Sequence, residues 1–153
     1  MKLLYRLGEQ DQFDIDDYKK KVHDKGATVL LVKTGVDWIA GGYTSVPWKN
    51  DPNHKTVSDE KAFLFSVQHR KKYPILKKEN AVRHTNNWGP IFGYPGWGLI
   101  IGWDKKRYPQ SIFEGCGYGN SEYGVPALNG KSALTGEGST YTLKEAEIFL
   151  IEN

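Results

Sequence analysis

The residues of this chain whose types and spacing could support chemistry are one cysteine, a pair of glutamates and four histidines. Cys116 is the single thiol and lies in a glycine-spaced run near Tyr118 and Glu114. A peroxide-reactive thiol needs a lowered pKa, from nearby cations or a helix N-terminus, and normally a second, resolving thiol. The sequence around Cys116 offers neither. A structural or sacrificial role is therefore favoured, with direct thiol catalysis as the alternative.

Glu145 and Glu147 lie two residues apart, so on a strand they share one face. Two such carboxylates can form an acid–base pair when the pKa of one is raised. Phe149 and Ile151 would lie on the same face, which favours a half-buried edge where one glutamate accepts hydrogen bonds from a loop. Structural pairing is thus preferred over catalysis. We assign no catalytic residue and favour a non-enzymatic protein.

The remaining candidate groups match no known site for a metal or cofactor. The four histidines lack the spacing of metal ligands, and a single cysteine excludes a cysteine-rich zinc site and an internal disulfide framework. No glycine-rich segment is followed by the Gly-Lys-Ser/Thr of a phosphate loop. We therefore expect no metal and no cofactor. The histidines are His23, His54, His69 and His84.

Length and charge limit the classes of protein further. The chain has 153 residues and a net charge of +3, which is only mildly basic and does not favour a dedicated nucleic-acid binder. No apolar run approaches the length of a membrane span, and no secretory leader is visible. We expect one domain, residues 1–153, in the cytoplasm.

A helix is expected from Phe13 to Gly26. Asp14 is a favourable N-cap, and Phe13 before it is placed to pack on Tyr18 in the first turns. Gly26 is placed to follow the last turn, where lysines gather and the helix dipole favours cations.

The next segments predict a central hairpin. Residues 27–33 form a continuous apolar run, which indicates a strand buried on both faces. A turn at Thr34-Gly35 would lead into a second strand over residues 36–41. Because Gly41 and Gly42 lack side chains, we expect that strand to end there in a bulge.

Tyr43 and Trp48 follow on either side of a short polar turn and are expected in the core, with Pro47 fixing the exit of the turn. Further apolar segments punctuated by glycine and proline continue to the C-terminus, which favours antiparallel over parallel strands. The fold class predicted is mainly β (α+β): a two-sheet antiparallel β-sandwich with flanking short helices.

A partner surface is sought among three long polar segments, 49–60, 69–78 and 104–111. The second, taken as a solvated connection between strands, holds the densest basic patch. Arg70, Lys71 and Lys72 are its candidate contacts with a protein partner. RNA or anionic membranes are weaker candidates, because the net charge is small.

Sugar binding is a further alternative, because exposed aromatic rings on a sandwich can hold carbohydrate. The tryptophans that could form such a platform also suit a packed core, and for Trp48 the core is favoured. They are Trp48, Trp88, Trp97 and Trp103.

Taken together, these segments resemble the TLDc domain, the module shared by oxidation-resistance proteins and their relatives. The resemblance covers nearly the whole chain and depends on the order and spacing of its motifs. Those motifs lie at residues 4–6, 13–26, 28–34, 41–48, 62–66, 89–93, 116–120 and 145–149. Its family-motif residues here are Gly41, Gly42, Tyr43, Pro47, Trp48, Gly89, Pro90, Gly93, Glu145 and Glu147.

The resemblance implies two antiparallel sheets packed face to face. It also implies a role in resistance to oxidative stress and, as in several relatives, binding to and regulation of the vacuolar proton pump (V-ATPase). Binding of that kind would place the protein in the cytoplasm at the surface of acidic organelles. No established active site comes with the family.

Overall fold

The computed structural model describes residues 1–8, 11, 13–94, 99–101, 113–114, 122–138 and 140–152. It contains one α-helix, one short 3₁₀ helix and fourteen strands within these residues. The elements are β1 (Lys2–Leu7), α1 (Ile15–Val22), β2 (Thr28–Thr34), β3 (Ile39–Thr44), β4 (Thr56–Val57), β5 (Phe63–Ser66), β6 (Lys71–Pro74), η1 (Lys78–Asn80), β7 (Val82–Arg83), β8 (Ile91–Phe92), β9 (Leu99–Ile100), β10 (Phe113–Glu114), β11 (Ala127–Leu128), β12 (Lys131–Ser132), β13 (Thr140–Tyr141) and β14 (Leu143–Leu150).

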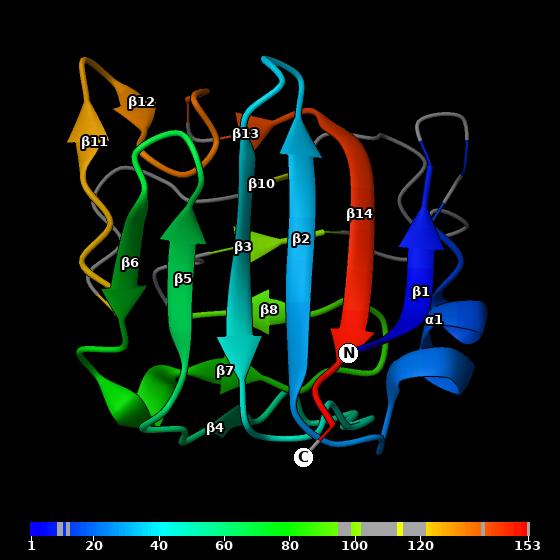
Figure 1. Ribbon diagram of the computed structural model, residues 1–153. Coiled ribbons are helices and arrows are strands. Elements are labelled where there is room, and N and C mark those ends of the chain that lie inside the picture. The colour runs from blue at the N-terminus through cyan, green and yellow to red at the C-terminus, as the bar shows by residue number, and fades with distance from the viewer. Residues whose placement is uncertain are drawn as a thin grey trace.

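Two antiparallel sheets form the main layers. The larger has six strands in the order β1-β14-β2-β3-β5-β6, and the smaller has the order β4-β7-β8-β9. In Figure 1 the six-stranded sheet lies in front, and β8 of the smaller sheet runs across behind β2 and β3. Helix α1 lies beside the β1 edge, and the β11–β12 hairpin lies beside β6. This arrangement confirms the predicted mainly-β sandwich with short flanking helices.

The core lies between the sheets and covers only one face of the larger sheet. In β2, Leu30 and Val32 are buried against the smaller sheet, whereas Val29 and Leu31 are half-buried on the opposite face. The prediction that this strand is buried on both faces is wrong, because the second layer covers one side only. We call the side away from the core the outer face.

Helix α1 begins as the sequence predicted. Asp14 caps it, with its carboxylate accepting hydrogen bonds from the N–H groups of Asp16 and Asp17, and the rings of Phe13 and Tyr18 lie 5.5 Å apart. The predicted C-terminal end is wrong, since the helix stops at Val22. Asp24, with φ 61°, is the left-handed residue that directly follows the C-cap His23, and Gly26, with φ 129°, comes two residues later.

The predicted central hairpin is confirmed, but its second strand begins later than expected. The turn is held by the N–H of Thr34, which donates to the carbonyl of Trp38. β3 therefore spans Ile39–Thr44 instead of residues 36–41.

The segment 69–78, expected to be a solvated connection, contains the edge strand β6. Tyr73 is its buried residue and pairs with Leu64 of β5. Tyr73 is the single buried residue of this strand and follows two exposed lysines, so the alternation of buried and exposed residues is too short to predict a strand from the sequence. The polar segment 49–60 likewise contains a short strand, β4, which pairs with β7.

Candidate functional site

Gly41 and Gly42 lie in the middle of β3 and pair without a bulge with β2 and β5, so the predicted bulged strand end is wrong. A Cβ atom on Gly41 would lie 1.9 Å from the carbonyl oxygen of Leu30 and 2.6 Å from the Phe65 ring. A Cβ atom on Gly42 would lie 2.8 Å from the Phe92 ring of the second sheet. The glycine pair thus lets an aromatic ring lie against each face of β3.

An aromatic cluster covers part of the outer face beside Gly41. Tyr43 and Phe63 stack with their centroids 5.2 Å apart, and Phe65 follows at 6.3 Å from Phe63. The Lys72 ammonium lies 4.1 Å from the centre of the Phe63 ring. Tyr43 is therefore half-buried on the outer face, and its predicted place in the core is wrong. Sequence analysis missed Phe65, although apolar residues at successive positions of β5 signal that both faces are covered.

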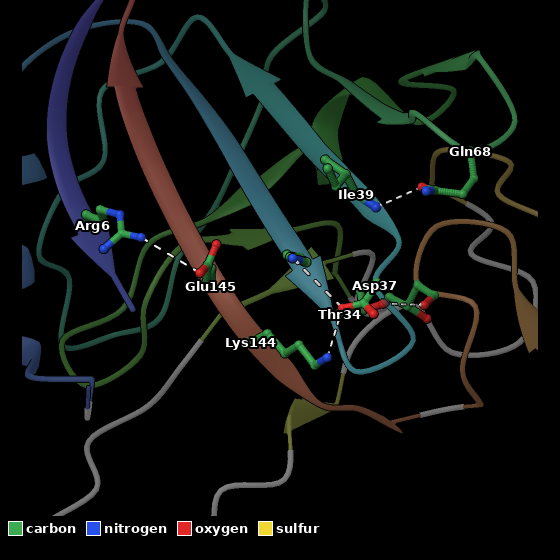
Figure 2. Close-up of polar contacts among 9 residues, drawn as sticks. Arg6, Thr34, Asp37, Ile39, Gln68, Lys144 and Glu145 are labelled. Carbon is green, nitrogen blue, oxygen red and sulfur yellow. Dashed lines mark hydrogen bonds and ion pairs between the residues drawn. The ribbon is translucent and has the colours of Figure 1, made fainter. Parts of the chain in front are cut away.

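Glu145 and Glu147 share the outer face of β14, as their spacing predicted, and help to line a shallow hollow with Leu31 and Lys33. The predicted edge position is wrong, because β14 lies between β1 and β2. Figure 2 shows Arg6 of β1 reaching Glu145, with the charged atoms 3.8 Å apart and both side chains about half exposed. This open, ion-paired setting suits a surface contact better than a buried acid–base pair.

Polar contacts hold the β2–β3 turn and the strand ends beside it (Figure 2). The Lys144 ammonium lies 2.8 Å from the Asp37 carboxylate in the β2–β3 turn, and this hydrogen bond lowers the pKa of Asp37. The side-chain oxygen of Gln68 accepts a 2.8 Å hydrogen bond from the N–H of Ile39. These contacts join the β2–β3 turn to β14, and the β5–β6 turn to the start of β3.

Asp59, which sequence analysis did not single out, fastens the turn after β3. Its carboxylate accepts hydrogen bonds from the hydroxyl of Thr44, from the hydroxyl and N–H of Ser45, and from the N–H of Lys61, at 2.7–3.0 Å. Burial raises the pKa of Asp59, but these hydrogen bonds together bring it below its ordinary value. Both carboxylate oxygens of Asp59 therefore accept hydrogen bonds from residues of the protein itself, and this carboxylate is not a candidate ligand-binding group.

Trp48 lies in the core, as predicted, and is 3% exposed. Its indole N–H donates to the Thr28 hydroxyl at 2.9 Å, and its ring lies 5.3 Å from that of Phe92. Pro47 before it is half-buried. Trp48 is thus part of the packing and not a sugar platform.

Two histidines lie near Trp48. Burial lowers the pKa of His23 to about 4, assisted by Lys19 and by His84. Burial also lowers the pKa of His84, and its Nε2 atom has no hydrogen-bond partner among the described residues. Both rings are therefore neutral at physiological pH.

The motif Gly89, Pro90 and Gly93 surrounds β8 and is buried. The N–H of Gly93 donates to the carbonyl of Ala81 at 2.8 Å, and its φ of 82° favours glycine. This motif positions β8, and with it Phe92, against the larger sheet.

Arg70, Lys71 and Lys72 are all exposed, but they do not form one patch. Arg70 lies in the β5–β6 turn with φ 51°. Lys71 and Lys72 follow in β6, where successive side chains point to opposite faces. Only Lys72 joins the outer face.

Several candidate residues lie outside the described part of the chain. These are Cys116, Trp97, Trp103 and the segment 104–111. Within the described part, no group of three or more His, Cys, Asp or Glu side chains is arranged to hold a metal ion. Nor does any described helix have the length and apolar character needed to cross a membrane.

Comparison with known proteins supplies the family. In the search of curated proteins, no sequence matched this chain. The protein-family model described as the TLDc domain matches residues 1–152, which is nearly the whole sequence. The chain therefore belongs to the TLDc domain family.

Proposed function

We propose that this chain is a protein-interaction module that binds and regulates the V-ATPase and so contributes to resistance against oxidative stress. The observation that carries the proposal is the match of the TLDc family over residues 1–152. Such a module would work in the cytoplasm, at the surface of acidic organelles. It would act through binding, as a non-enzymatic regulator.

The end of the β5–β6 hairpin is the proposed place of contact. Arg70, Lys71 and Lys72 are exposed there, and the neighbouring Val67 is 48% exposed. Cations on both faces of the hairpin end, with an apolar neighbour, suit an acidic partner that receives this end, since rim charges speed encounter and fix orientation. This region projects from one end of the larger sheet (Figure 1).

The test is capture of V-ATPase subunits from a cell lysate, followed by binding to the purified pump. The variant is Arg70→Asp with Lys71→Glu and Lys72→Glu; aspartate suits the left-handed backbone at position 70. The expected result is loss of most V-ATPase binding with an unchanged melting temperature.

A matched control reverses three other exposed lysines, Lys20, Lys25 and Lys131, and so changes the net charge equally. This control should bind like wild type. If the wild-type protein captures no V-ATPase subunit, the proposed function is wrong. If both triple variants bind like wild type, the pump contact lies elsewhere.

A further inference from the structure

The turn between β2 and β3 and the turn between β5 and β6 meet at one end of the larger sheet (Figure 1). Three of the seven large apolar residues that are exposed in the described chain lie there: Val36 and Val67 are each 48% exposed, and Ile39 is 37% exposed. Single apolar side chains scattered over a surface are ordinary, but three within two neighbouring turns indicate a contact surface. We call residues 35–39 and 67–70 the end surface.

Hydrogen bonds hold the two turns of the end surface together. The N–H of Val67 donates to the carbonyl of Ile39 at 3.0 Å. The N–H of Ile39 donates in turn to the side-chain oxygen of Gln68 at 2.8 Å (Figure 2). Both backbone groups of Ile39 are therefore bonded to the β5–β6 turn, and the exposed side chains of the two turns keep a fixed spacing.

The ring of Trp38 makes the end surface more rigid. Its centre lies 5.2 Å from that of the His69 ring in an edge-to-face arrangement. It also lies so close to Gly136 that a Cβ atom there would be 2.7 Å from the indole. The buried hydroxyl of Thr34 donates to the carbonyl of Thr135 at 2.9 Å and holds the same loop. A surface that already has its binding shape loses little conformational entropy when a partner binds.

The charges of the end surface favour an acidic partner. Its single acidic residue, Asp37, lies 2.8 Å from the Lys144 ammonium and 3.9 Å from that of Lys33, so its charge is already compensated. Arg70, whose N–H donates to the carbonyl of Val67, forms no ion pair with any described residue. The uncompensated charge is therefore positive and lies beside an exposed apolar side chain.

We propose that the end surface binds an acidic segment of a protein partner, in which apolar side chains alternate with carboxylates. The apolar side chains pack on Val36, Ile39 and Val67, and the carboxylates lie toward Arg70. The inference rests on the proposed function, which places a contact at the end of the β5–β6 hairpin. It adds the β2–β3 turn to that contact and states the chemistry of the partner segment.

The experiment uses three short synthetic peptides. The first combines leucines with aspartates and glutamates, the second has the acids replaced by asparagine and glutamine, and the third has the leucines replaced by serine. Binding is measured by fluorescence anisotropy and mapped by amide chemical shifts. Wild type should prefer the first peptide over the second by about threefold to tenfold, as expected for exposed charge pairs. It should prefer the first over the third by about tenfold or more.

Two variants of the protein separate the apolar and the charged parts of the contact. Val36→Ser with Val67→Ser should weaken binding of the first peptide about tenfold and keep the preference for acids. The charge-reversed variant at Arg70, Lys71 and Lys72 should lose the preference for acids and keep the preference for leucine. The matched control is Leu76→Ser with Leu128→Ser, which removes two exposed apolar side chains elsewhere and should bind like wild type.

The inference is overturned if no peptide binds wild type up to about 1 mM, or if Val36→Ser with Val67→Ser binds the first peptide like wild type. It is also overturned if that variant abolishes self-association in sedimentation, because a second copy would then occupy the end surface. The pump experiment fails separately. Peptide binding without V-ATPase capture refutes the proposed function alone, and V-ATPase capture without peptide binding refutes the acidic-segment site alone.

Discussion

Gly42 of β3 faces Phe92 of β8 so closely that a single methyl group would lie 2.8 Å from the aromatic ring. This contact sets the distance between the two sheets at the centre of the sandwich. Its neighbour Gly41 has the same role on the other face, where the Phe65 ring lies against the backbone. One dipeptide therefore determines both the packing of the core and the shape of the outer face.

Substitution of these glycines should destabilise the fold. Gly42→Ala should cost about 1–3 kcal/mol, because the Phe92 ring must shift in a packed core. Gly41→Ala should cost more, because its Cβ would meet the carbonyl oxygen of Leu30, which cannot rotate away. Urea unfolding measures both. Gly138→Ala is the control, since no atom lies within 4 Å of its Cβ position, and a cost equal to that of Gly42→Ala would contradict this account.

Asp59→Asn should destabilise the protein by about 2–3 kcal/mol, because charge-assisted hydrogen bonds to a buried carboxylate are lost and an amide cannot accept from all of the same donors. Thermal unfolding at neutral pH measures the loss. The control is Glu60→Gln, an exposed neighbour that should change stability little. Equal stability of Asp59→Asn and wild type would show that the carboxylate network contributes nothing.

Acid should destabilise the protein before its carboxylates titrate. His23 and His84 have lowered pKa values in the native state, because desolvation of the half-buried His23 ring and the buried His84 ring disfavours the charged form. The unfolded chain therefore binds protons first, and stability falls as the pH drops from about 6.5 toward about 4. The pKa of Asp59 is also lowered in the native state. Its contribution to stability is therefore lost at a more acidic pH, below its ordinary pKa of 3.8, as the carboxylate becomes protonated.

Replacing both histidines tests whether they cause this loss of stability in acid. His23→Gln with His84→Gln should flatten the dependence of melting temperature on pH between about 7 and 4.5. Several charged groups also face these rings, namely Lys19, Asp24, Lys49 and Asp51, so the comparison is made in one buffer at fixed salt. The exposed His69→Gln variant is measured beside the double variant as the control for loss of a histidine. An unchanged slope in the double variant would contradict the account.

Trp48→Phe should cost about 2–4 kcal/mol, since it leaves a cavity beside Phe92 and removes the donor to the buried Thr28 hydroxyl. Chemical denaturation followed by circular dichroism measures the change. Thr28→Val in the same background should recover part of the loss, because it removes the unpaired hydroxyl. If Thr28→Val recovers no stability, the destabilisation comes from the cavity alone and the lost hydrogen bond contributes nothing.

The sequence by itself determined those features that depend on neighbours along the chain. The Asp14 cap, the packing of Phe13 on Tyr18 and the central hairpin could all be predicted, because capping and alternation act over a few residues. The same holds for the shared face of Glu145 and Glu147. The order and spacing of the motifs along the chain also indicated the TLDc family.

Only the tertiary structure decided the features that depend on strand pairing. It placed Gly41 and Gly42 inside β3, divided Lys71 from Lys72 in an edge strand, and brought Arg6 to Glu145 from the other end of the chain. An apolar line on the outer face belongs to the same class, since its six residues come from six strands and share no local motif: Leu3, Phe149, Val29, Tyr43, Phe63 and Pro74. The physical reason is that sheet register follows from contacts summed over all neighbouring strands, and no short segment contains that sum.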